Sequence, residues 1–339
     1  MKKLGVILAI AAIAVLGLPP VLGMLTEAQV NARVDSLAAN PFVTASVSSF
    51  DRGWFSSTTR IQLRLSQNYI TQLEALNARS GNPVPAALTR GVTILVDMTH
   101  GPVAVRDGVH FGLSKMVARL DPETQGYAEL LQRLGIPYLF EFRGRTGFST
   151  AVDFEADVPP IDFVAEDSRV RLSGAVLDGS FAGGSVQYDG RIDSLELTSG
   201  TGAVSLQGLS ATGDNELRSP YLVLGTIELS IARATMLDAT VAAGPVVAAS
   251  NLRFSSDFEL DDSGAFASGQ ATYAAESIVA PDTQIRDATL RIVFRNLDVA
   301  ALEAYAQAAQ RGAIAGLADP NQLLADVTPA VERLLAAGP

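Results

Sequence analysis

The chain has 339 residues, of which 48% are hydrophobic and 18% charged, and it contains no cysteine. This length suits one large domain or two ordinary ones, and the lack of cysteine excludes disulfides, thiolate metal sites, cysteine nucleophiles and a lipid-modified cysteine. The formal net charge of −11 at pH 7 comes without any basic patch, which excludes nucleic-acid binding because an acidic surface is repelled by phosphates.

Residues 1–25 are typical of a membrane-directing segment. Lys2 and Lys3 precede an uncharged, apolar run from Leu4 to Leu25, which as a helix would be about 33 Å long, close to the thickness of a bilayer core. Two interpretations stay open: an uncleaved inner-membrane anchor, or a signal peptide cut after Gly23. Both predict that the rest of the chain lies in the cell envelope and faces the periplasm.

Residues 26–40 are predicted to form a short linking helix. Thr26 is a suitable N-cap, and Val30, Val34 and Leu37 recur at helical spacing before Pro41. This helix separates the apolar segment from the body of the chain.

Residues 41–298 are predicted to form a β-rich body, because the apolar residues there recur with a period of two. Ile61, Leu63 and Leu65 alternate with polar residues, and the same pattern occurs at 227–231, 252–260 and 290–294. Strands with one apolar and one charged face belong to sheets with one wet face, which favours antiparallel pairing. The Gly- and Ser-rich stretch 169–215 is interpreted as a meander of hairpins.

Asp- and Gly-containing turns between these runs support hairpins. The expected turns are Asp51-Arg52-Gly53, Asp178-Gly179, Asp189-Gly190 and Asp262-Ser263-Gly264.

Helices are expected at a few places in and after the body. They are Tyr69–Ala78, Pro122–Leu134 with Asp121 as its N-cap, Val299–Gln310 with Asp298 as its cap, and Gln322–Ala337. The last two make up a helical segment over 299–339. The predicted fold is therefore mainly β, a β-rich α+β protein: a long, curved, largely antiparallel sheet with short helices covering part of one face, preceded by an N-terminal hydrophobic helix.

No pattern of catalytic, cofactor-binding or metal-binding residues is found. The sequence lacks a phosphate-binding loop and a nucleophile elbow. The two histidines are His100 and His110, and a histidine-based metal site would need both together with carboxylates. The alternative is that His100 is hydrogen-bonded in a turn at a strand end and His110 lies on a wet sheet face. We therefore expect a non-enzymatic protein without a cofactor.

The sole tryptophan, Trp54, follows the Asp51-Arg52-Gly53 turn. One interpretation is a hairpin tip in which Gly53 takes a positive φ and Trp54 and Phe55 pack on the body. The other is a tip that docks a partner or touches a membrane.

Three motifs in this order resemble the YdgA-like family of bacterial envelope proteins, a domain of unknown function. They are Phe50-Asp51-Arg52-Gly53-Trp54-Phe55-Ser56-Ser57, Thr99-His100-Gly101-Pro102 and Phe294-Arg295-Asn296-Leu297-Asp298. The resemblance implies an inner-membrane-associated protein that faces the periplasm and has no established catalytic residues. Because family members continue into further strands after the last helices, it also implies a short or truncated member.

The residues singled out for interaction are those of the first two motifs: Asp51, Arg52, Gly53, Trp54, Phe55, His100, Gly101 and Pro102. Three functions stay open. The first is a non-enzymatic envelope protein that binds a lipid or another apolar ligand on its sheet. The second is an interaction or scaffold protein in envelope assembly, and the third is a hydrolase.

Overall fold

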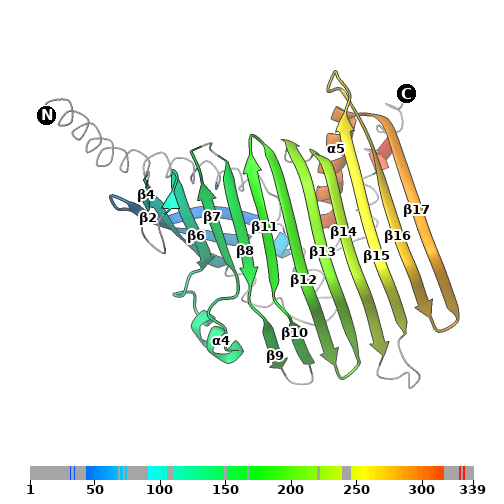
Figure 1. Cartoon of the computed structure of the whole chain (residues 1–339), viewed down its shortest axis with the longest axis horizontal. Helices are drawn as coiled ribbons and strands as arrows, with labels where there is room; N and C mark the ends of the chain where they lie inside the picture. Colours follow the sequence, from blue (N-terminus) through cyan, green and yellow to red (C-terminus); the bar gives the residue numbers. More distant parts are fainter. Residues whose placement is uncertain are drawn as a thin grey trace. The chain divides into compact units, whose positions relative to one another are not determined.

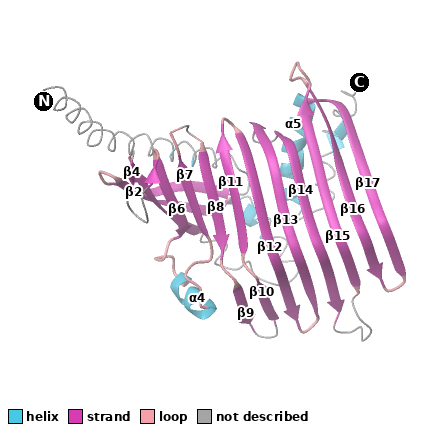
Figure 2. Cartoon of the chain, in the orientation of Figure 1, coloured by secondary structure: helices cyan, strands magenta, loops and turns pink. Residues whose placement is uncertain are grey.

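The fold is mainly β and antiparallel in the computed structural model of the chain, as the alternating pattern predicts (Figure 2). The structure describes residues 31, 34, 43–67, 69–71, 73–74, 91–101, 103–104, 110–148, 151–165, 168–219, 222–238, 246–316, 328–329 and 331–332. The chain forms two compact units. The first comprises residues 1–128, 141–154 and 310–323, and the second comprises residues 129–140, 155–309 and 324–339.

The first unit contains an antiparallel sheet with the strand order β1-β2-β3-β6-β7. Its strands are β1 (Val43–Arg52), β2 (Ser56–Leu65), β3 (Val92–His100), β6 (Ser114–Leu120) and β7 (Glu141–Thr146). Two short strands, β4 (Val103–Ala104) and β5 (His110–Phe111), pair separately.

The second unit contains longer strands in the order β8-β11-β12-β13-β14-β15-β16-β17 (Figure 1). They are β8 (Val152–Val158), which begins in the first unit, β11 (Ala175–Ala182), β12 (Ser185–Ser199), β13 (Gly202–Ser219), β14 (Leu222–Asp238), β15 (Val247–Leu260), β16 (Phe266–Ala280) and β17 (Thr283–Asp298). The expected meander over 169–215 is present with one difference. Strand β10 (Ser168–Leu172) pairs with β9 (Ile161–Ala165) and with the far end of β12, not with β11.

Two of the four expected turns are confirmed and two are wrong. The first joins β1 to β2 and begins at Gly53, since Asp51 and Arg52 are the last residues of β1. The second, at Asp262-Ser263-Gly264, joins β15 to β16. Asp178-Gly179 and Asp189-Gly190 instead lie inside β11 and β12, where Asp178 pairs with Asp189. The chain turns at Gly183-Gly184, whose φ angles are +59° and +93°, because two consecutive glycines adopt positive φ at less cost than an Asp-Gly pair.

The predicted helix at Pro122–Leu134 begins later, as α4 (Tyr127–Leu134). Asp121 still caps this segment, since its Oδ1 accepts a hydrogen bond of 3.0 Å from the Glu123 amide. The chain then makes tight turns as far as Gly126, whose φ of +78° is incompatible with a right-handed helix.

The helix expected at Val299–Gln310 is confirmed and is longer, as α5 (Val299–Gly316). Asp298 is its N-cap, because its Oδ1 accepts a 2.8 Å hydrogen bond from the Ala301 amide. Residues 69–71 and 73–74 are helical within the expected helix Tyr69–Ala78, and residue 67, just before it, is helical as well. Residues 328–329 and 331–332 are helical within the expected helix Gln322–Ala337.

The predicted segment 1–25 lies outside the described residues, as does most of the linking helix 26–40, of which residues 31 and 34 are helical. Among the helices that the structure describes, none combines the length and the apolar character needed to cross a membrane.

A line of unpaired positions crosses strands β12 to β17 of the second unit. Each of these strands contributes one residue that has no partner in the register, although the residues on both sides of the line are paired. From β12 to β17 these residues are Asp193, Gly208, Ala232, Asn251, Glu276 and Asp287. Every second member has a positive φ: Gly208 (+60°), Asn251 (+49°) and Asp287 (+51°). An inserted residue of this kind rotates the side chains that follow it, as in a β-bulge.

The apolar pattern shifts by one residue at this line. On β15, Val247 and Ala249 precede the line at odd positions, and Leu252 and Phe254 follow it at even positions. On β16, Ile278 lines the same hollow as Ala275 although the two are three residues apart. The line therefore keeps one face of the sheet apolar along the length of the strands.

Candidate functional site

The first two motifs come together at the β1–β2 hairpin of the first unit. The Gly53 amide donates to the Ser56 carbonyl at 2.7 Å, which closes the turn, and the His100 amide donates to the Phe55 carbonyl at 2.9 Å. Ser57 Oγ and His100 Nε2 are also 2.9 Å apart. The hairpin is thus hydrogen-bonded to the end of β3, which pairs with β2 along its length.

Ser57 and His100 resemble a nucleophile and its base, but both are enclosed. Ser57 is 2% and His100 is 1% exposed, so a substrate cannot reach the hydroxyl without opening of the hairpin. The pair holds β2 to the end of β3, which agrees with the hydrogen-bonded interpretation of His100. Among the described residues, no group of three or more potential ligands is arranged for a metal ion.

The remaining motif residues have different environments. Asp51 and Arg52 are exposed at the end of β1, Gly101 is buried and donates to the Leu113 carbonyl at 3.1 Å, and Pro102 lies outside the described residues. His110 lies on β5, where its backbone pairs with Ala104 on β4.

The expected conformation of the hairpin tip, Gly53–Phe55, is wrong in two respects. Gly53 is not among the residues with positive φ; glycine fits there because an added Cβ would lie 3.0 Å from the Ser56 carbonyl oxygen. Trp54 and Phe55 do not pack on the body either, since 54% and 43% of their surfaces are exposed.

An ion pair that no sequence pattern indicated supports the same sheet. Arg60 Nε donates to Asp121 Oδ2 at 2.7 Å, and Arg60 Nη2 lies 3.4 Å from Glu123 Oε2. The hydrogen bond to Asp121, followed by the two negative charges, raises the pKa of Arg60 above its usual value. Because these residues lie 61 positions apart, only the paired sheet brings them together.

The apolar face of the second unit carries a long trough. Two hollows of 410 Å³ and 510 Å³ adjoin at Leu229 and Ile231, which line both. The first extends from Ala156 on β8 to β14, and the second extends from β14 to Leu290 on β17. With neighbouring strands about 4.8 Å apart, seven steps from β8 to β17 give a length of roughly 34 Å.

Large apolar side chains along the trough are open to solvent. Leu229 is 44%, Tyr273 48% and Leu290 58% exposed. Small residues form the floor beside them, notably Ala275 on β16 and Ala288 on β17. Monomeric proteins rarely expose a large contiguous apolar patch without a binding role.

Glycines on this face give large side chains room to lie flat over the strands. An added Cβ at Gly190 would lie 3.1 Å from Leu177 Cδ1, and one at Gly269 would lie 2.8 Å from Phe258 Cδ1. Aromatic pairs across neighbouring strands, such as Phe254 and Tyr273 with ring centroids 4.9 Å apart, stabilise the same face.

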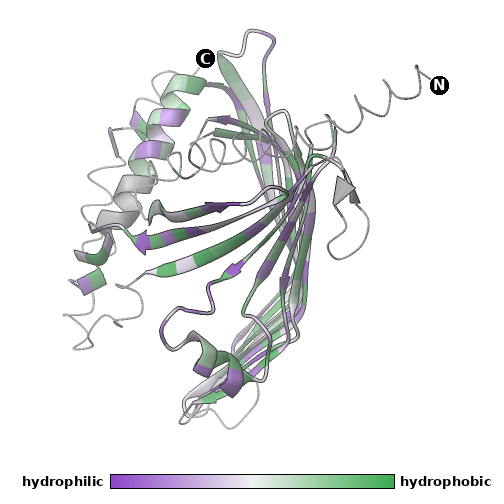
Figure 3. Ribbon diagram, turned by 90° about the vertical axis from the view of Figure 1, so that its left-hand side faces the viewer, coloured by the Kyte–Doolittle hydropathy of each residue, from purple (hydrophilic) through white to green (hydrophobic). Residues whose placement is uncertain are grey.

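Helix α5 lies on one side of this sheet (Figure 3). The part that belongs to the second unit ends at Ala309, and Ala308 in its last turn there is 6% exposed. Near the start of β16, Ala267 is fully buried. The apolar face is therefore covered at this end of β16 and open along the trough.

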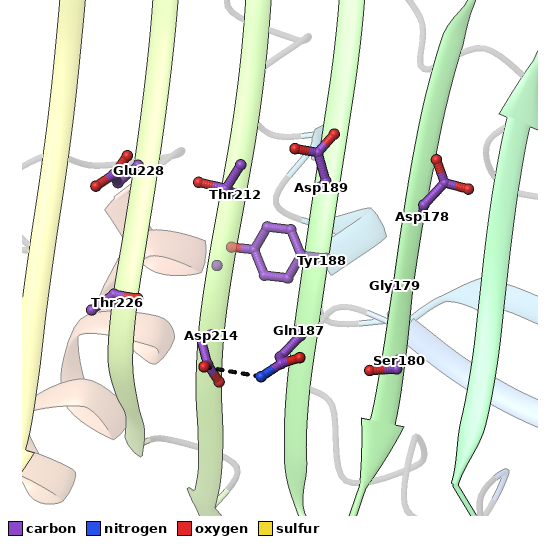
Figure 4. Close-up of a pocket in the computed structure, with 11 residues that line it drawn as sticks. Asp178, Gly179, Ser180, Gln187, Tyr188, Asp189, Thr212, Asp214, Thr226 and Glu228 are labelled. Carbon is purple, nitrogen blue, oxygen red and sulfur yellow. Dashed lines mark hydrogen bonds between the residues drawn. The ribbon is translucent and has the colours of Figure 1, made fainter.

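The opposite face of the same strands is polar (Figure 4). A hollow of 540 Å³ is lined by Asp178, Asp189, Asp214 and Glu228, among others. Gln187 Nε2 donates to Asp214 Oδ2 at 3.0 Å, and Asp178 and Asp189 are direct neighbours across the strands. Adjacent carboxylates of this kind are tolerated because water solvates them.

The trough residues were not singled out as a site from the sequence. Each of them fits an ordinary amphipathic strand, so no single residue marks the site. A usable signal is present in the shift of the apolar pattern by one residue at similar places in successive strands, and in the run of small residues on β16.

Comparison with known proteins identifies the family. The chain belongs to the family described as bacterial protein of unknown function (DUF945), whose model matches residues 1–339. No curated protein and no solved structure matches the chain.

Proposed function

We propose that this DUF945 protein binds the acyl chain of a lipid, or another apolar ligand, in the trough on the apolar face of its second unit. The observation that carries the proposal is the exposure of Leu229, Tyr273 and Leu290 around a floor of small residues. A role of this kind requires no catalytic group and no cofactor.

The dimensions of the trough suit an acyl chain. Its length of roughly 34 Å exceeds the reach of one acyl chain, since two opposed chains fill a bilayer core of about 30 Å. Each methylene group removed from water contributes about 0.8 kcal/mol, so a chain lying against the exposed side chains gains enough to offset the cost of its immobilisation.

The location in the cell envelope is part of the same proposal. The apolar run from Leu4 to Leu25 behind Lys2 and Lys3 would direct the chain to the inner membrane, and its β-rich part would then face the periplasm close to a source of lipid. The motifs that resemble the YdgA-like family support this location. A curved sheet with helices over part of one face would suit this role.

The proposal is tested by direct binding of a fluorescent probe. A dansyl-labelled fatty alcohol is titrated into the purified protein, and the variant Ala288→Phe is compared with the matched variant Val293→Phe. Ala288 lines the trough, whereas Val293 on the same strand is 50% exposed and outside the trough lining. We expect Ala288→Phe to weaken probe binding at least tenfold and Val293→Phe to leave it within twofold of wild type.

Equal probe binding by wild type and Ala288→Phe contradicts the proposal, as does a failure of the probe to saturate. An independent measurement is mass spectrometry of solvent extracts from protein purified out of its native membrane fraction. Recovery of a stoichiometric apolar compound supports the proposal.

A second candidate function, an interaction or scaffold role in envelope assembly, is favoured by the hairpin tip. Trp54 is 54% exposed, and tryptophan is enriched among the residues that dominate protein–protein binding. The tip would then be the docking element. Trp54→Ala that abolishes crosslinking to a neighbour in intact cells, with unchanged thermal unfolding, would support it. The third candidate, a hydrolase, gains no support from the buried Ser57–His100 pair.

A further inference from the structure

Two turns of the first unit lie at the same end of its sheet. Along that end Ser56 pairs with Thr99, and Thr99 pairs with Lys115. Lys115 in turn pairs with Arg145. The β1–β2 turn comes directly before Ser56, and the turn from β7 to β8 begins directly after Thr146. Three strand steps of about 4.8 Å separate the two turns, a distance of roughly 14 Å.

Each of these turns exposes aromatic side chains. Trp54 and Phe55 are exposed in the β1–β2 turn, and Phe148 in the β7–β8 turn is 64% exposed. Among the described residues, no large apolar side chain is more exposed than Phe148. These rings add little to the stability of the fold, because much of their apolar surface still contacts water. Aromatic side chains with one wet and one apolar side are typical of membrane interfaces, where tryptophan is enriched.

Basic side chains lie along the same end of the sheet. Lys115 and Arg145 are direct partners across β6 and β7, although like charges in such positions repel each other. Arg52 is exposed at the end of β1, beside the first turn. The exposed carboxylates Asp51 and Asp153 lie close by in the chain, so this end is distinguished by cations beside aromatic tips and not by net charge. An anionic surface would relieve the repulsion between Lys115 and Arg145.

We propose that this end of the first unit, a tip surface made of Trp54, Phe55, Lys115, Arg145 and Phe148, docks on a bilayer that contains anionic phospholipids. The aromatic rings would enter the headgroup region, and the two cations would contact lipid phosphates. A bilayer fits this surface better than a protein partner does, because its apolar anchors lie on two turns roughly 14 Å apart, whereas protein-binding residues cluster in a packed centre. The proposal does not require a ligand in the trough, so the two proposals can fail independently.

The fluorescence of Trp54 provides the test. Trp54 is the only tryptophan of the chain, so its emission reports on the tip surface alone. The purified full chain is mixed with vesicles of equimolar phosphatidylcholine and phosphatidylglycerol whose acyl chains carry bromine, a short-range quencher. We expect Trp54 emission to shift to shorter wavelength, to be quenched by the bromine and to become less accessible to dissolved acrylamide. Insertion of the run from Leu4 to Leu25 would not by itself give this result, because bromine quenches only a ring that enters the bilayer.

Charge-reversed variants test the contribution of the cations. Lys115→Glu combined with Arg145→Glu is expected to lower the quenched fraction of Trp54 emission about threefold or more, because each lost cation weakens the attraction to anionic lipid. Arg286→Glu combined with Arg291→Glu, at exposed positions of β17, changes the net charge equally and is expected to match wild type. Vesicles of phosphatidylcholine alone should reproduce the loss in wild type.

A further variant tests the aromatic contribution without a change of charge. Phe148→Ser should lower the quenched fraction about twofold, because binding at an interface scales with the apolar area that is buried. Phe266→Ser is the control, since Phe266 is 39% exposed in the second unit. Thermal unfolding of each variant establishes that a loss of quenching does not come from misfolding.

Three results count against the proposal. Trp54 emission that stays unquenched by bromine and open to acrylamide in the mixed vesicles overturns it. Crosslinking from position 54 in intact cells that captures a protein and no lipid assigns the surface to a protein partner and overturns it as well. Equal quenching in wild type and in the Lys115→Glu/Arg145→Glu variant overturns the requirement for anionic lipid.

Discussion

The two units of the chain use polar residues in opposite ways. In the first unit, polar side chains are buried and paired: Ser57 with His100, and Asp121 with Arg60. In the second unit, the apolar face itself is exposed, with Leu290 more than half accessible. The motif residues Ser57 and His100 therefore support structure, whereas the exposed apolar face of the second unit carries no motif.

The physical difference lies in how much each position is constrained. A buried histidine tolerates few replacements, because removing its partner leaves a polar atom in a dry environment. An exposed leucine on a sheet loses little stability on replacement, because its surface already contacts water. The comparison predicts large stability effects without binding effects at the buried residues of the first unit, and the reverse on the exposed face of the second.

The largest expected effect is that of His100→Ala. The substitution leaves a cavity and a buried Ser57 hydroxyl without its partner, so the free energy of unfolding should fall by about 3 kcal/mol. Denaturant unfolding measures this loss, with Trp54→Ala at the exposed tip as the control, expected to change it by less than about 1 kcal/mol. A loss of similar size for Trp54→Ala would mean that the exposed tip stabilises the fold as much as the buried Ser57–His100 pair does.

Breaking the ion pair should have the next largest effect. Asp121→Ala removes the partner of Arg60 and the cap on the Glu123 amide, and is expected to cost about 2 kcal/mol, less than a fully buried pair because the Arg60 side chain is 31% exposed. Urea unfolding monitored in 1 M salt should retain most of this loss, since the Asp121 side chain is 4% exposed. A loss that disappears in high salt would place the pair among ordinary surface pairs.

In the second unit, Leu290→Ser should separate binding from stability. The side chain is 58% exposed, so the free energy of unfolding should change by about 0.5 kcal/mol or less, while affinity for the dansyl-labelled fatty alcohol should fall severalfold. Unfolding and fluorescence titration of one preparation give both values. A large stability loss with unchanged affinity would mean that Leu290 belongs to a packed core.

The smallest expected effect concerns the β15–β16 turn. Asp261 accepts hydrogen bonds from Ser263 Oγ at 2.7 Å and from the Phe266 amide at 3.1 Å, which hold its pKa below the usual value. Because the folded-state pKa is the lower one, the contribution is fully present above about pH 4 and is lost as the pH falls through the folded pKa. Asp261→Asn should therefore lower the thermal midpoint slightly at pH 7, and its difference from wild type should shrink as the pH falls through the folded pKa.

Local patterns predicted much of the fold. The alternation at 61–65, 227–231, 252–260 and 290–294 indicated antiparallel strands, and Asp298 indicated the start of α5, because both signals act between residues close in the chain. The Asp-Gly pairs at 178 and 189 led to two wrong turn predictions for the same reason. Their turn preference is local, and it was overridden by pairing along β11 and β12.

The sequence by itself determined that the chain is mainly β, antiparallel and divided between an apolar and a polar side, since side-chain alternation is a property of each strand alone. Only the tertiary structure decided that Ser57 meets His100 across 43 positions, and that the unpaired line from Asp193 to Asp287 keeps the apolar face continuous. These features depend on strand register, which is set by the sum of many weak contacts between residues distant in the chain.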